Sequence, residues 1–112
     1  MPQLNFETYQ QRSRATARYP DAGSNVIYPT LGLCSEAGEV ADKVKKVLRD
    51  AKGEFSPEAL AAIRLELGDV LWYVAQLATE LGLDLDLIAR ANLEKLASRA
   101  SRNVISGSGD SR

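Results

Sequence analysis

Two pairs of acidic residues stand in stretches of the chain whose pattern is otherwise that of buried helix. Glu66 and Asp69 interrupt residues 65–78, which are apolar on nearly every side of a helix. Glu36 and Glu39 repeat the same spacing of three residues upstream, so each pair lies on one helical face. A buried carboxylate without a compensating charge costs several kcal/mol. Each pair therefore needs a positive partner.

If two helices place these pairs face to face, four carboxylates converge on one site. Four like charges stay together in a partly dry site only with cations, and all-oxygen ligation suits Mg²⁺, Mn²⁺ or Ca²⁺. Mg²⁺ commonly shares its coordination with substrate phosphates, so the functional hypothesis is a phosphate-hydrolysing site. The structural alternative is a pair of solvated faces, or an ion-pair network with Arg64, Lys43 or Lys46.

Each acidic pair encloses a glycine just before its second acid, Gly38 in one case and Gly68 in the other. Glycine in a helix interior costs about 1 kcal/mol relative to alanine. We therefore expect the two helix backbones to approach closely at this level.

The elements that must position these acids are all helical. Apolar residues recur with a helical period throughout, and no stretch alternates with the period of a strand. Caps and breakers predict helices over about residues 5–18, about 29–51, 56–82, and from Asp84 or Asp86 to about residue 100. Short connections favour antiparallel neighbours. The expected fold is an all-α four-helix bundle forming one domain over residues 1–105, with a flexible Gly/Ser tail over residues 106–112.

Composition excludes several other classes of function. The formal net charge of −1 argues against non-specific nucleic-acid binding. Cys34 is the only cysteine, which suits a reducing compartment, and the N-terminus does not have the pattern of a signal peptide. No apolar run reaches membrane-spanning length, so we expect a cytoplasmic protein without a membrane partner. The absence of histidine excludes His-based triads and most zinc sites.

Several further residues are candidates for binding a substrate. Asn92, Lys95 and Arg99 follow one stripe of the last helix and would face phosphates; the alternative is a solvated basic face near a helix C-terminus. Tyr73 lies one turn beyond Asp69, where it would either stack on a nucleotide or pack in the core.

Lys46 would either meet phosphates or form a helical ion pair with Asp42. Polar and aromatic residues of the first helix and its loop, among them Tyr9 and Tyr19, are candidates for a base pocket, although packing is the commoner role.

The acid pairs, together with residues 92–99, resemble the MazG-like all-α nucleoside-triphosphate pyrophosphohydrolases, relatives of the dimeric dUTP and dCTP pyrophosphatases. The matching motifs are Glu36-x-x-Glu39, Glu66-x-x-Asp69 and the stretch Asn92-x-x-Lys95-Leu96-x-x-Arg99. The resemblance implies that Mg²⁺, with Mn²⁺ as a possible substitute, binds the four acids. It also implies cleavage between the α- and β-phosphates, and homodimers or homotetramers with sites built partly across subunits.

One position departs from many relatives, which have a further glutamate where this chain has Ser35. Glu39, with Glu36, is therefore expected to act in catalysis as well as in metal binding, unless no separate base is needed.

Two alternatives remain beside a general nucleoside triphosphatase. One is a base-specific dNTP pyrophosphatase acting on dUTP, dCTP or dGTP. The other, from a different class, is a non-catalytic helical interaction module.

Overall fold

The computed structural model describes residues 3–111 and contains four α-helices and one 3₁₀ helix in this part of the chain. They are α1 (Phe6–Ser13), η1 (Arg14–Thr16), α2 (Ile27–Asp50), α3 (Pro57–Glu80) and α4 (Leu85–Ser101). The predicted all-α fold with four α-helices is thereby confirmed. Residues 1, 2 and 112 of the expected domain and tail lie outside the described part.

Local sequence signals account for where the helices begin and end. Asn5, Ser56 and Asp84 cap α1, α3 and α4, because their side chains accept hydrogen bonds from the first free backbone N–H groups. Gly53 and Gly82 follow α2 and α3 in the left-handed conformation, with φ of +79° and +70°. The first predicted helix is shorter than expected, because its last turn tightens into η1.

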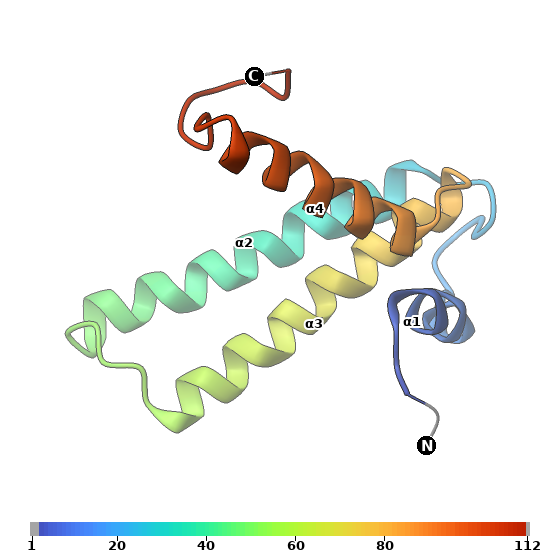
Figure 1. The fold of residues 1–112 in the computed structure, drawn as a ribbon. Coiled ribbons are helices and arrows are strands. Elements are labelled where there is room, and N and C mark those ends of the chain that lie inside the picture. The colour runs from blue at the N-terminus through green and yellow to red at the C-terminus, as the bar shows by residue number, and fades with distance from the viewer. Residues whose placement is uncertain (1–2, 112) are drawn as a thin grey trace.

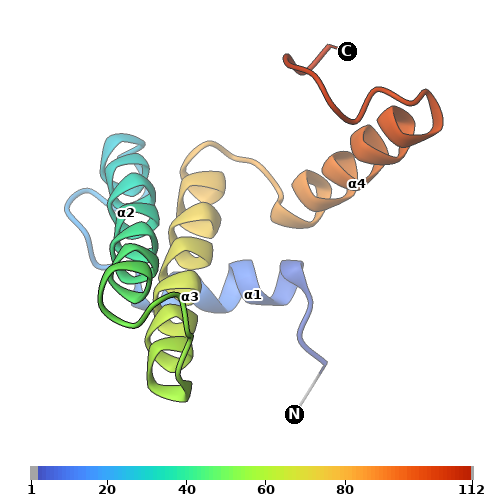
Figure 2. The same ribbon diagram turned by 90° about the vertical axis from the view of Figure 1, so that its left-hand side faces the viewer.

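Two long antiparallel helices, α2 and α3, form the body of the molecule (Figure 1). Helix α1 packs across the C-terminal half of α3, and α4 packs mainly against α1. Figure 2 shows α4 leading away from the α2–α3 pair. None of the described helices is long and apolar enough to cross a membrane.

The core is small and lies where α1, α2 and the C-terminal half of α3 meet. Its buried residues include Ala75, Ala78 and Leu85, with Tyr19 from the loop after η1. The apolar side chains of α2 are only partly buried, and Cys34 is exposed. Exposed apolar residues run along both long helices: Cys34, Ala37, Ala41 and Leu48 on α2, and Leu60, Leu67 and Leu71 on α3.

Candidate active site

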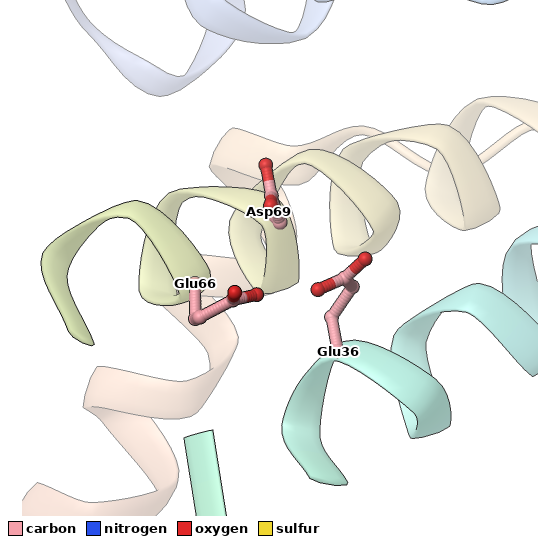
Figure 3. Close-up of side chains that lie close together, drawn as sticks. All are labelled: Glu36, Glu66 and Asp69. Atoms are coloured by element: carbon pink, nitrogen blue, oxygen red, sulfur yellow. The ribbon is translucent and has the colours of Figure 1, made fainter. Parts of the chain in front are cut away.

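Three of the four predicted metal ligands lie together between the two long helices. Glu36 of α2 and Glu66 and Asp69 of α3 each offer a carboxylate oxygen within 4.8 Å of the others (Figure 3). Helical spacing brings Glu66 and Asp69 onto one face, and antiparallel packing places Glu36 opposite them. The acids therefore form one cluster rather than two solvated faces.

The cluster holds more negative charge than the described side chains neutralise. A hydrogen bond to Glu66, together with burial and the charge of Asp69, raises the pKa of Glu36 to about 6. The pKa of Glu66 is lowered, first by this hydrogen bond and then by Lys43. Glu36 therefore acts as the donor and Glu66 as the charged acceptor. The Lys43 ammonium lies 3.2 Å from a Glu66 oxygen and supplies one positive charge to the cluster.

Glu39 lies outside this three-acid group. Its side chain is 52% exposed, and its nearest cation is Lys43, at 3.9 Å. Glu39 is therefore more open to solvent than Glu36 or Glu66. Its roles as metal ligand and base stay predictions.

The expected close approach at Gly38 and Gly68 is wrong for the described chain. A methyl group at either position would meet no heavy atom within 4 Å. The close approach occurs one turn before the cluster instead, at Gly32, where an added methyl would overlap the ring of Tyr73. Glycine at this position lets the Tyr73 ring lie directly against α2.

A cavity of about 250 Å³ opens beside Glu36. Tyr28 and Tyr73 contribute aromatic groups to its lining, and Ser35 and Glu36 contribute polar groups. Sequence reasoning identified Tyr73 but missed Tyr28 and Gly32. The signal was present, because Tyr28, Gly32 and Glu36 follow at i, i+4 and i+8 and so share one face of α2.

The cavity adjoins a cluster of four aromatic rings. Tyr28 and Tyr73 have ring centroids 6.5 Å apart, and Tyr19 stacks on Tyr28 at 5.1 Å with an interplanar angle of 9°. Trp72 meets Tyr19 and Tyr73 edge to face. Its indole N–H donates to the Ser13 carbonyl, at 3.2 Å. The wall of the cavity is thus continuous with the core around the loop after η1.

The sequence of this chain matches the MazG nucleotide pyrophosphohydrolase domain over residues 29–104, a range that includes the acid cluster and most of the cavity lining. The chain belongs to the MazG family. A protein of Mycobacterium phage L5, named Gene 37 protein, is 47% identical over 114 aligned positions, covering 97% of this chain and 100% of that protein. No solved structure matches the chain significantly. The family resemblance inferred from the acid motifs is thereby confirmed.

The donor set of this MazG domain fits a hard divalent cation. All three clustered groups are carboxylates, and they converge so closely that the pKa of Glu36 is raised to about 6. Oxygen ligands of this kind suit Mg²⁺ or Mn²⁺. Glu36, Glu66 and Asp69 are the side chains that would hold the ion.

The predicted phosphate-binding residues of α4 lie elsewhere in this MazG chain. Lys95 Nζ lies 3.2 Å from Asp110 of the tail, and the buried Arg99 donates to the Asp110 carbonyl at 2.9 Å. Asn92 is exposed. Lys46 pairs with Asp42 on α2 at 2.7 Å. The roles proposed for these four residues in substrate binding stay predictions.

The polar residue Gln76, two turns beyond Asp69 on α3, contacts α1 and η1 and not the acid cluster. It is fully buried and donates to Ser13 Oγ at 2.8 Å, while its carbonyl accepts from Arg14 at 3.1 Å. Helix α1 and η1 cover this turn of α3, so Gln76 serves their packing.

Proposed function

We propose that this protein hydrolyses nucleoside triphosphates to nucleoside monophosphate and pyrophosphate with Mg²⁺ bound at the acid cluster. The observation that carries the proposal is the cluster of Glu36, Glu66 and Asp69 directly beside a cavity with two aromatic walls. The cluster would hold the triphosphate through the ion, and the cavity would hold the nucleoside. Family membership supports the same reaction.

Bound at these carboxylates, Mg²⁺ would stabilise charge on phosphate oxygens and lower the pKa of an attacking water. The residues of the chain do the positioning. Lys43 holds the Glu66 carboxylate at 3.2 Å, and the Tyr28 and Tyr73 rings offer faces for a base. The raised pKa of Glu36, about 6, means that protons compete with the ion at and below that pH, because a carboxyl group binds a metal ion in its deprotonated form.

The proposed enzyme is an oligomer in which α4 of a second copy completes the site. Within one chain α4 leads away from the α2–α3 pair, and in the proposed oligomer Asn92 and Lys95 would serve the site of another copy. The exposed apolar stripes on α2 and α3 offer the surface for this contact, since large exposed patches commonly mark interfaces. The implied stoichiometry is a dimer, or a dimer of dimers.

The test is incubation with Mg²⁺ or Mn²⁺ and a panel of canonical NTPs and dNTPs, with separation of nucleotide products and an assay for pyrophosphate. Monophosphate and pyrophosphate in equal amounts support the proposal, and the ranking of bases reveals whether the enzyme is specific for one dNTP. Turnover of no nucleotide, without stabilisation by Mg²⁺ and nucleotide, contradicts it and favours an interaction module.

A further inference from the structure

The carboxylate of Glu80 is enclosed at the C-terminal end of α3, where its side chain is 0% exposed. One oxygen accepts hydrogen bonds from Arg14 at 2.7 Å, from the Tyr19 hydroxyl at 2.6 Å and from the Gly23 N–H at 2.8 Å. The other oxygen accepts from the Asn25 N–H at 2.8 Å. Every donor belongs to residues 14–25, so one side chain ties down the whole connection between α1 and α2.

This anchor stays charged at neutral pH. The Tyr19 hydroxyl and the Asn25 N–H, followed by Gly23 and Arg14, lower the pKa of Glu80 to about 2 against the opposing effect of burial. A negative charge in the last turn of a helix is unfavourable to the helix dipole. An enclosed ion pair is also a weak source of stability compared with apolar packing. A role in fixing one conformation explains the group better than stability alone.

The conformation that Glu80 fixes reaches the proposed nucleoside cavity. Tyr19 donates to Glu80 through its hydroxyl and stacks on Tyr28 through its ring, with centroids 5.1 Å apart. Tyr28 in turn lines the cavity together with Glu36 and Tyr73. A continuous series of contacts therefore runs from Glu80 through Tyr19 to Tyr28, while Glu80 itself lines no part of the cavity.

We propose that Glu80 is a positioning residue for nucleotide binding, which fixes Tyr19 and, through it, the Tyr28 wall of the cavity. The inference rests on the proposed function of the acid cluster. It assigns Glu80 to the binding of the nucleoside, and it leaves the phosphates and the metal ion to the acids. Loss of the Glu80 charge should therefore weaken nucleotide binding more than it slows the reaction of bound nucleotide.

The test compares Glu80→Gln with Asp86→Asn, a matched loss of charge at an exposed ion pair between Asp86 and Arg90. Binding of a triphosphate with an α,β-methylene bridge is followed by the fluorescence of Trp72, the only tryptophan, with KM and kcat measured on the best substrate. We expect Kd and KM to rise about tenfold in Glu80→Gln with kcat within about twofold of the unaltered protein. Asp86→Asn should match the unaltered protein.

A double-mutant cycle with Tyr28→Ala separates positioning from a general structural role. If Glu80 acts through Tyr28, Glu80→Gln should raise Kd much less when the Tyr28 ring is already gone. An equal rise in both backgrounds overturns the proposal, as does a fall in kcat with unchanged KM.

Should Glu80→Gln fail to fold, Tyr19→Phe provides the same test, because it removes the hydroxyl and keeps the stacked ring. Unchanged nucleotide affinity in Tyr19→Phe would then overturn the proposal. Failure of the unaltered protein to bind any nucleotide would contradict the proposed function itself. If the unaltered protein and Glu80→Gln bind nucleotide equally well, the positioning role of Glu80 is contradicted and the proposed function is not.

Discussion

Glu36 on α2 and Glu66 on α3 share a hydrogen bond that raises the pKa of Glu36 to about 6 and lowers the pKa of Glu66. This contact joins the two acidic motifs across the helix pair and brings Asp69 within reach of both. Such a carboxyl pair suits a divalent cation, because a bound ion would offset the repulsion between like charges that helps to raise the pKa of Glu36.

The first prediction concerns the cluster itself. Glu36→Gln and Asp69→Asn should each lower kcat/KM at least about 100-fold, because loss of groups that merely orient metal ligands already costs about 10–100-fold. Without Mg²⁺, Glu36→Gln should melt no lower than the unaltered protein, since an amide keeps a donor toward Glu66 and adds no charge. The exposed Glu54→Gln serves as control. Full activity in Glu36→Gln would count against the assignment.

The second prediction concerns the contact between Gly32 and Tyr73. Gly32→Ala should destabilise the protein by about 1–3 kcal/mol through overpacking, partly offset by about 1 kcal/mol of helix propensity. KM for nucleotide should rise, because the Tyr73 ring must leave its place in the cavity wall. Urea unfolding checks the first effect and steady-state kinetics the second.

The control for this prediction is the same substitution in a Tyr73→Ala background. With the ring gone, the added methyl overlaps nothing, and Gly32→Ala should be neutral or stabilising. Additive losses in the double variant would show that the methyl strains something other than Tyr73.

The third prediction is a pH dependence of stability. Glu80 has a pKa of about 2 in the folded protein, below the unfolded value of about 4.3. Its carboxylate therefore contributes stability that is fully present above about pH 5 and is lost as the pH falls toward 2. The difference in unfolding free energy between the unaltered protein and Glu80→Gln should shrink over this range. A difference that stays constant from pH 7 to pH 2.5 would contradict the assigned pKa.

Much of this architecture is predictable from the sequence because it is local. Asn5, Ser56 and Asp84 mark helix starts through caps that need only their own helix, and the i, i+3 acids share a face by geometry alone. The meeting of Glu36 with Glu66 also follows, once two long helices are joined by a short turn.

The parts that could not be predicted depend on contacts between distant residues. Glu80 accepts from donors more than 50 positions away, and no local period marks it. The direction of α4 depends on its packing against α1. The close approach predicted at Gly38 and Gly68 occurs at Gly32 instead. The sequence could not distinguish these positions, because the position of a glycine does not reveal which side chain lies opposite it.

The fourth prediction tests whether the site is shared between copies. Glu36→Gln and Lys95→Ala should each be nearly inactive alone, because one removes a metal ligand and the other a phosphate contact. When the two variants are mixed in equal amounts and exchange subunits, half of the dimers are hybrids. Each hybrid has one intact site of two, so about one quarter of normal activity should return. No recovery, with subunit exchange shown by mass spectrometry, would contradict a site that is shared between copies.

The most direct test of the account is to follow one nucleoside triphosphate with Mg²⁺ by ³¹P NMR, using the unaltered protein, Glu36→Gln and Glu54→Gln. The account predicts equal amounts of monophosphate and pyrophosphate from the unaltered protein and from Glu54→Gln, with almost no reaction in Glu36→Gln. Formation of orthophosphate and nucleoside diphosphate would contradict the claim that this acid cluster cleaves the bond between the α- and β-phosphates. An undiminished reaction in Glu36→Gln would contradict it as well.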